Sequence, residues 1–419
     1  MQRKHVVAVA LLLTLASTLA GCWGRRELEE QAFVMAVGVD KGKESLYSVT
    51  FAIALPEKMA GGGKGGGGGG KPLMLTTLEA PTVAAAISMA DSILSRQLSL
   101  RHTKALFMGE ELAQISGMHT MDEFVRFREA RRTIFYIVTK GKAADVLKGM
   151  EPKLEKDPQR FIQMITYNVR NTGMVPAESQ IQHFVTAVST GYTEPITYYL
   201  ALKEEEKEGG DEKKPGKMSG PLEGGFKAGE LPREGGPNIE LLGGAAFLGE
   251  KMVGVLTGED MRMILMLQDK FQHGLFSIPD PRRQDLFVSL ELHQGRPLDL
   301  SVDLSGPTPR LTGLVTLEGD LLSIQSNRDY TEPELQAVLE KAAAQAIATR
   351  IAETVKKTQD WGTDVVGFGK EVVKQFGTVP AWEQYKWLDR YRTATVEIRV
   401  RVLLRRFGKQ LSPPEVRTS

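Results

Sequence analysis

The reactive side chain that stands apart in this sequence is the thiol of Cys22, because it belongs to the only cysteine in the chain. It directly follows Leu19-Ala20-Gly21, a run of small and apolar residues typical of a cleavage site. A thiolate is a nucleophile that can carry a thioether-linked diacylglycerol, whereas Ser or Ala at this position could not. The spacing therefore predicts lipid attachment at Cys22 after removal of residues 1–21.

The leader before Cys22 has the three regions of an export signal. Residues 3–5 form a basic start, residues 6–15 an apolar run, and residues 16–21 a group of small side chains. The apolar run is about half of the roughly 20 residues that cross a hydrocarbon core, so we expect cleavage and not retention as an anchor. Two acyl chains would then hold the protein at a bilayer, where one gives only marginal binding. The alternative is a plain secretory signal cleaved beside a cysteine.

Other groupings that could do chemistry lack a partner at the required position. Residues 65–71 match the G-x-x-x-x-G-K phosphate loop, but Pro72 replaces the Ser or Thr hydroxyl and the backbone N–H that follow it. The six histidines are scattered without the i, i+4 spacing of a metal site. The adjacent Glu110 and Glu111 would point apart on a helix. Since no nucleophile elbow or H-E-x-x-H helix occurs either, the sequence predicts no catalytic site, metal or cofactor.

The charge balance argues against a nucleic-acid partner. Lys and Arg number 53 against 52 Asp and Glu, and the formal net charge is +1. We find no basic tract with interleaved aromatic residues. One local group of cations, Arg126, Arg128, Arg131 and Arg132, has two interpretations: contact with anionic headgroups or an acidic partner, or a solvated helix face paired with residues such as Glu129. The sequence favours the solvated face.

Length and composition divide the chain into two to three domains. Removing 21 of 419 residues leaves 398, enough for several cores of ordinary size. With no cysteine but Cys22, these cores must stand without disulfides. We expect a mixed α/β domain at 22–200, with a glycine-rich loop at 61–70, and a charged, glycine-rich linker at 201–237. A small β-β-α middle domain at 238–285 and a C-terminal α+β domain at 286–419 should follow.

Apolar periodicity places the elements that build these domains. In the first domain it predicts a β-hairpin at 33–40 and 47–53, a helix at 82–94, strands at 105–108 and 133–139, and helices at 110–115, 121–131, 143–147, 161–171 and 180–189. Beyond the linker it predicts strands at 241–248 and 252–256, a helix at 258–268, and short strands at 286–292, 299–304 and 310–317.

The C-terminal domain should contain the longest helix and a final strand. The helix is expected to begin at Thr331, with Glu334 completing a capping box, and to run to Gln359. Alternation of apolar and charged residues over 396–404 predicts a strand with one buried and one wet face. The stretch 361–387 concentrates large aromatic residues that are anchors of either a core or an interface, and we favour the core: Phe368, Phe376, Trp382, Tyr385 and Trp387.

A series of short segments extends in order across the whole mature chain: 22–28, 37–40, 102–104, 109–113, 141–147, 243–247, 253–256 and 364–369, followed by Trp382 and Trp387. Taken in this order, the segments resemble the Ger(x)C family of spore-germination lipoproteins. The glycine tract at 61–70 and the charged segment after Leu202 depart from the family pattern, and we interpret both as insertions.

The resemblance implies mixed β-sheets flanked by helices and a non-enzymatic role. Members are the lipoprotein (C) subunit of germinant receptors, assembled with two integral membrane subunits, of A and B type, in the inner spore membrane. This chain would then be lipid-anchored on the outer face of the cytoplasmic membrane, and only Cys22 transfers as a functional residue. The alternatives are a solute-binding surface lipoprotein, which should show two similar α/β lobes, and a surface hydrolase.

Overall fold

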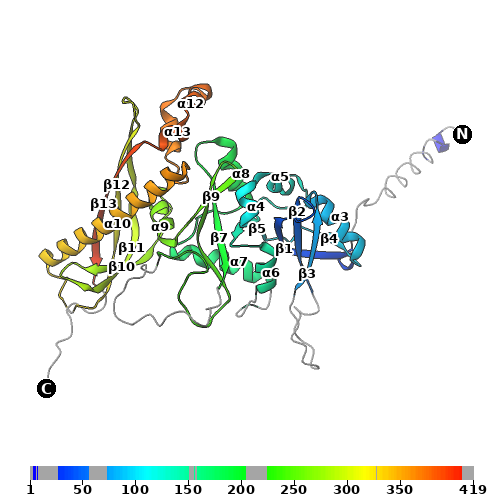
Figure 1. Cartoon of the computed structure of the whole chain (residues 1–419), viewed down its shortest axis with the longest axis horizontal. Coiled ribbons are helices and arrows are strands. Elements are labelled where there is room, and N and C mark those ends of the chain that lie inside the picture. The colour runs from blue at the N-terminus through cyan, green and yellow to red at the C-terminus, as the bar shows by residue number, and fades with distance from the viewer. Residues whose placement is uncertain are drawn as a thin grey trace, which may run out of the picture.

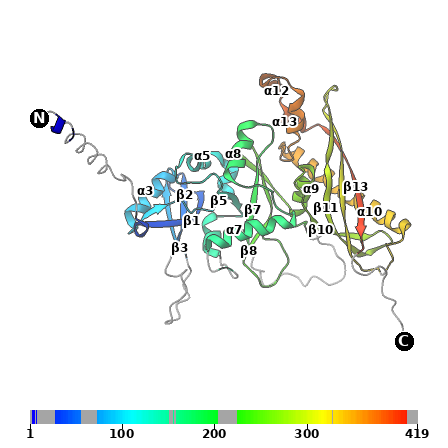
Figure 2. The ribbon, with the colours of Figure 1, turned by 180° about the vertical axis from the view of Figure 1, so that it is seen from behind.

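A computed structural model of the chain describes residues 3–5, 7, 27–55, 73–150, 155, 158–203, 224–326 and 328–407. The described residues form two β-sheets with helices packed on them, one sheet toward each end of an elongated body (Figures 1 and 2). Cys22, the glycine tract at 61–70 and residues 204–223 lie outside the described residues. The expected fold class of mixed β-sheets flanked by helices, with a long helix before a C-terminal strand, is confirmed.

The first sheet has nine strands in the order β3-β2-β1-β5-β6-β7-β8-β9, with β4 paired to β1. Its central strands β1, β5, β6 and β7 run parallel, while β2, β3, β8 and β9 join antiparallel at the two sides. The strands are β1 (Gln31–Lys41), β2 (Tyr47–Ala54), β3 (Leu73–Ala80), β4 (Gln97–Ser99), β5 (Ala105–Gly109), β6 (Phe135–Thr139), β7 (Ile196–Leu202), β8 (Ile239–Leu248) and β9 (Lys251–Leu256).

Helices cover both faces of the first sheet, as parallel strands require. One face carries α3 (Val83–Ile93), α4 (Glu110–Ile115), α5 (Met118–Arg126) and α8 (Ile181–Thr190). The other carries α6 (Ala143–Gly149) and α7 (Pro158–Asn168), which is followed by η2 (Val169–Thr172).

The hairpin and the first helix are confirmed. Strands β1 and β2 pair antiparallel from Val34 opposite Ile53 to Lys41 opposite Tyr47. Helix α3 begins after Thr82, whose hydroxyl accepts the N–H of Ala85 at 3.0 Å. The helix expected at 121–131 corresponds to α5, which begins at Met118 and ends at Arg126, five residues before the expected end.

The second sheet has the order β10-β11-β12-β13. Strand β10 (Gly274–Asp280) and the long strands β11 (Arg283–Asp303) and β12 (Arg310–Ile324) pair antiparallel, and β13 (Thr395–Arg406) pairs parallel with β12. The two short strands expected at 286–292 and 299–304 are one continuous strand. Register shifts around Gln294 and Arg296 absorb the break in alternation at Gly295 and Pro297.

Residues 238–285, expected as a middle domain, are divided between the two sheets. Strands β8 and β9 extend the first sheet, and Leu202 pairs with Ile239 across the charged segment. The charged segment therefore connects two neighbouring strands of one sheet, β7 and β8. Helix α9 (Gly258–Leu267) and β10 pack into the second core instead. The domain boundaries drawn from the sequence remain predictions.

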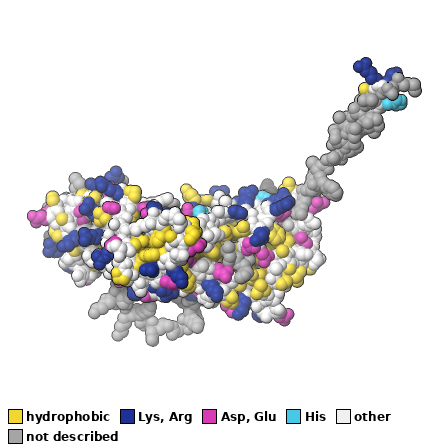
Figure 3. All heavy atoms as spheres, turned by 90° about the horizontal axis from the view of Figure 1, so that it is seen from above, with side chains coloured by type: hydrophobic (Ala, Val, Ile, Leu, Met, Phe, Trp, Pro, Cys, Tyr) yellow, Lys and Arg dark blue, Asp and Glu magenta, His cyan; other side chains and the backbone are white. Residues whose placement is uncertain are grey.

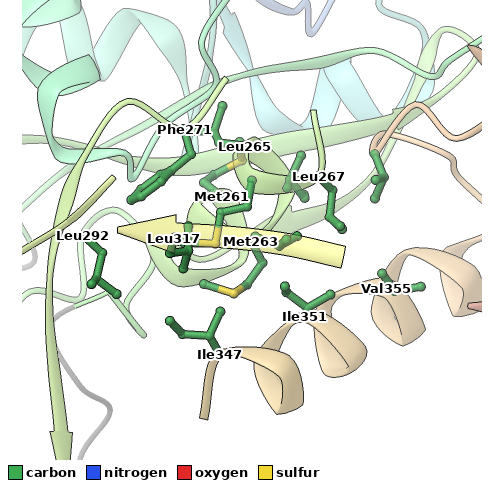
Figure 4. Close-up of a cluster of buried hydrophobic side chains, with 14 of the residues drawn as sticks. Met261, Met263, Leu265, Leu267, Phe271, Leu292, Leu317, Ile347, Ile351 and Val355 are labelled. Atoms are coloured by element: carbon green, nitrogen blue, oxygen red, sulfur yellow. The ribbon is translucent and has the colours of Figure 1, made fainter. Parts of the chain in front are cut away.

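Helix α9 is buried on nearly every side at the junction of the two halves. Its side chains Met261 and Met263 lie beside Leu292 of β11 and Leu317 of β12, and Ile351 of α10 lies alongside (Figure 4). Unbranched Met side chains suit such an irregular space because their three rotatable bonds adapt to it. Helix α10 (Pro333–Trp361) packs along β13 on the same core.

The expected capping box of the long helix is wrong. The residue before α10 is Glu332, and no side chain caps the first turn. The hydroxyl of Thr331 donates instead to Asp329, which also accepts the N–H of Thr331, and it is therefore turned away from the helix. A capping box does occur at α9, between Thr257 and Asp260.

After α10 the chain forms α11 (Gly369–Val372), η3 (Val373–Gln375), α12 (Val379–Tyr385) and α13 (Trp387–Tyr391) before β13. Phe368, Trp382 and Trp387 are buried, which confirms the core interpretation of these three aromatic residues. In the part of the chain that the structure describes, no helix combines the length and apolar character needed to cross a bilayer.

Candidate functional site

The predicted lipid attachment residue, Cys22, lies outside the described residues, so lipidation stays a prediction. The continuous described chain begins at Glu27, five residues later, and passes through η1 (Leu28–Glu30) into β1. Strand β1 lies toward one end of the body, far from the second sheet (Figure 1). Any tether at Cys22 would therefore leave from the end of the molecule that carries the first sheet.

Three segments that carry the family resemblance meet at Asp40, where β1 ends. Its carboxylate accepts the backbone N–H groups of Ala143 and Ala144, at 2.7 and 2.9 Å, in the first turn of α6. Gly109 lies so close that a Cβ there would overlap Oδ1 of Asp40. Burial raises the pKa of Asp40, and these N–H groups oppose the rise. Asp40 thus fixes α6 on the sheet.

A hollow of about 270 Å³ opens beside Asp40, at the carboxyl ends of β1, β5 and β6. Helix α4 follows β5 on one face and α6 follows β6 on the other, which is the position where α/β sheets commonly bind ligands. Here the carboxylate of Asp40 already occupies the N–H groups at the start of α6, and Lys41 pairs with Glu111 at 2.6 Å. The arrangement therefore positions loops, and Asp40 already fills the place at the start of α6 where an anion would bind.

A second buried carboxylate, Asp364, organises the C-terminal half. It accepts the backbone N–H groups of Gly367, Phe368 and Gly369, at 2.8, 3.1 and 2.6 Å, and the indole N–H of Trp387 at 2.8 Å. Burial raises the pKa of Asp364, and the four donors act in the opposite direction. The family-like segment 364–369 is therefore a loop wound around one carboxylate.

The same loop fastens the two halves of the molecule together. The carbonyl oxygen of Asp364 accepts the backbone N–H of Glu194 at 3.0 Å and the hydroxyl of Thr193 at 3.1 Å, just before β7 of the first sheet. Gly254 of β9 lies against the ring of Trp361 so closely that a Cβ would overlap it. These contacts make the two sheets one scaffold.

A cleft of about 330 Å³ lies at this junction, between α8, the loop before β7, the end of α9 and residues 365–370. Charges of both signs line it: Lys270 pairs with Glu178 at 2.6 Å, and His183 lies 3.4 Å from the same carboxylate. Burial lowers the pKa of Lys370, and the nearby Lys270 adds to this effect. A lining with charges of both signs suits a small zwitterion. The carboxylate of Glu178, however, is already paired with Lys270.

The remaining predictions about site chemistry are placed as follows. Arg126 pairs with Asp122 at 2.6 Å on α5, as expected of a solvated helix face, whereas Arg128 and Arg131 lie exposed in the loop beyond it. Glu110 and Glu111 do not share a site: Glu110 accepts from Tyr199 at 3.3 Å, and Glu111 pairs with Lys41. Among the described residues no cluster of three or more His, Cys, Asp or Glu side chains could hold a metal.

Comparison with known proteins finds a family match for each half of the chain. Residues 24–202 match the spore germination protein N-terminal domain, and residues 242–408 match the spore germination B3/GerAC-like C-terminal domain. The chain belongs to the Ger(x)C family of spore germination proteins. Membership of this family gives it a role in spore germination.

Relatives of the Ger(x)C family match over almost their full length. Spore germination protein KC of Bacillus subtilis is 26% identical, with 99% of this chain and 98% of the relative covered. Spore germination protein GerQC of Bacillus cereus is 19% identical, with 93% and 97% covered. The crystal structure of the GerBC protein matches with a TM-score of 0.52 at 14% identity, covering 88% of this chain and 96% of that one, which shows a shared fold.

Proposed function

We propose that this chain is the lipid-anchored, non-enzymatic C subunit of a germinant receptor and works by contact with the receptor's integral membrane subunits of A and B type. The observation that supports this most is positional. The match to the family's N-terminal domain begins at residue 24, two residues after Cys22. The match to the family thus begins directly after the expected lipid attachment residue. An anchor at Cys22 would hold the protein on the outer face of the cytoplasmic membrane, which becomes the inner spore membrane.

A tethered protein of this kind would act through its high effective concentration near the membrane partners and through its ordered loops. A lipid anchor confines the protein near its membrane partners and raises their effective concentration without any new contact. The carboxylates of Asp40 and Asp364 are committed to backbone N–H groups, so their described role is to hold loops in place. Docking of a body whose loops are already ordered costs less conformational entropy than docking of a body that must order its loops on binding.

The proposal is tested by replacing the thiol in sporulating cells. Cys22→Ala should leave the protein folded, move it from the membrane fraction to the soluble fraction, and impair nutrient-triggered germination. Ser17→Ala, which alters the leader but keeps the thiol, should change neither. Unchanged germination with mislocalised protein would contradict the need for a tether, and membrane retention of Cys22→Ala would contradict lipid anchoring.

The cleft at the junction of the two halves is a candidate solute site, so the alternative function is that of a solute-binding surface lipoprotein. Such proteins are expected to have two similar α/β lobes, whereas the two sheets here have nine and four strands and different topologies. A thermal-shift screen with amino acids and sugars separates the two functions. A ligand at 100 times its dissociation constant adds about 2.7 kcal/mol to the free energy of unfolding.

A further inference from the structure

The end of the first sheet nearest the N-terminus carries exposed cations on two loops. Arg96 precedes β4, and Arg128 and Arg131 follow α5. None of these three side chains forms an ion pair with another described residue. Lys and Arg side chains gather beside a His side chain on this end of the molecule (Figure 3). The positive charge is confined to these two loops, because the neighbouring residues 27–30 and helix α3 carry the exposed acids Glu27, Glu29, Glu30 and Asp91.

One partly buried acid, Glu129, joins the two loops. The carboxylate of Glu129 accepts the backbone N–H of Leu100 at 3.2 Å and lies 3.7 Å from Nε of Arg101. Its side chain is only 22% exposed, so it faces the body while Arg128 and Arg131 on either side face solvent. The ring of His102, next to Arg101, meets the ring of Phe33 edge to face at 4.9 Å. The cations therefore adjoin the start of β1.

Exposed apolar side chains share this end of the body. Leu28 in η1 is 74% exposed, and Met89 and Ile93, one turn apart on α3, are 43% and 63% exposed. A hollow of about 370 Å³ opens nearby at the start of β1, with Phe33, Ile53, Leu55, Met74, Leu94 and Arg96 among its lining residues. Single exposed apolar residues are ordinary on protein surfaces, but a group beside a cationic loop is typical of a bilayer interface.

Chain length limits how far this end can stand from a bilayer. Glu27 is five residues after Cys22, and five extended residues span at most about 18 Å. The range over which charges act at physiological salt is about 8 Å. An acylated Cys22 would therefore keep Glu27 within about 18 Å of the headgroups, which allows the loops to approach to the range over which charges act but does not force them to.

We propose that this tether-end face, formed by Met89, Ile93, Arg96, Arg128 and Arg131, lies against the headgroups of an anionic bilayer. The three arginines contact lipid phosphates, and the apolar side chains enter the interface. The face thereby fixes the orientation of the elongated body, with the second sheet held away from the membrane. The inference rests on the proposed lipid tether for the position of this face near the bilayer. The binding energy of the face comes from its own side chains and does not depend on the tether.

Vesicle co-sedimentation tests the face without any lipid on the protein. The probe is the mature chain with Cys22→Ala, mixed with vesicles of equal parts phosphatidylglycerol and phosphatidylcholine. The parent should bind at low salt, lose binding as salt rises, and bind phosphatidylcholine vesicles weakly. Reversing Arg96, Arg128 and Arg131 to Glu should weaken partitioning by at least about 100-fold, because each basic residue near an anionic surface contributes about fivefold and each new Glu is repelled in addition.

A matched control reverses three exposed cations of the second sheet, Arg310→Glu, Arg399→Glu and Arg401→Glu, with the same change in net charge. Binding of this control should stay close to that of the parent. Equal loss in both variants, or no binding of the parent to anionic vesicles, would overturn the proposal. If the reversed variant unfolds, Met89→Asp with Ile93→Asp provides a second test of the face. Because no acyl chain is present, these outcomes are independent of whether Cys22 is lipidated in cells.

Discussion

The indole N–H of Trp387 donates to the carboxylate of Asp364 at 2.8 Å, inside the core and between residues 23 positions apart in the chain. This bond closes the loop 364–369 onto the last short helix before β13, while the backbone of Asp364 binds the loop before β7. Two sheets and the family-like C-terminal segment thus depend on one carboxylate.

We predict that Asp364→Ala lowers the free energy of unfolding by about 3–5 kcal/mol, because four donors lose their acceptor in a buried site. Trp387→Phe removes only one of these donors and keeps most of the packing, so it should cost less, about 1–2 kcal/mol. Chemical denaturation followed by tryptophan fluorescence and far-UV circular dichroism measures both. A loss below 0.5 kcal/mol for Asp364→Ala (about the size of a typical surface substitution) would remove Asp364 from this role.

The close approach of Gly109 to Asp40 predicts that a larger residue at position 109 destabilises the protein. Gly109→Ala places a Cβ on the Asp40 carboxylate and should cost about 1–3 kcal/mol, as overpacking in a close-packed site does. Gly377→Ala is the control, since a Cβ there meets no atom within 4 Å and its backbone dihedral is ordinary. Equal stability of the two variants would show that the Asp40 contact is loose.

The raised pKa of Asp40 predicts a direction of pH dependence. A carboxyl whose folded pKa lies above its unfolded value contributes stability that is fully present below the unfolded pKa and is lost as pH rises through the folded pKa. The difference in unfolding free energy between wild type and Asp40→Asn should therefore fall as pH rises above 3.8. Urea titrations of both proteins at several pH values measure this difference. A difference that grows with pH would mean that the two N–H donors outweigh burial.

The junction cleft supplies a prediction that separates the two functions. If the chain is a receptor subunit that works by contact, amino acids and sugars should leave its melting temperature unchanged. A stabilising solute whose effect disappears in Lys270→Ala, but not in Lys374→Ala on the exposed surface of η3, would instead assign binding to the cleft. That outcome would favour the solute-binding alternative.

Local periodicity predicted most elements, because their burial follows from sequence neighbours. The alternation over 396–404 became β13, and the helical spacing after Thr82 became α3. The sequence could not place β8 and β9 in the first sheet, since the pairing of β8 with β7 spans the charged segment and depends on contacts far apart in the chain. Thr331 fits the helix-start rule equally well, but Asp329 competes for its hydroxyl.

The candidate site was less accessible from sequence. Asp40 and Asp364 each stand within a glycine-containing segment, and an Asp three to five residues before Gly367 and Gly369 is a signal for a loop wound around a carboxylate. What the pattern cannot give is the distant partner: Ala143 for Asp40 and Trp387 for Asp364. Those contacts exist only after the sheet and helices have packed.

The central claim is that this family fold is carried on a lipidated cysteine, and intact-mass and peptide mass spectrometry of the protein purified from spore membranes tests it most directly. We predict a mature chain that begins at Cys22, with the leader removed and diacylglycerol on the sulfur. A free thiol at Cys22, or a chain that retains residues 1–21, would contradict the account.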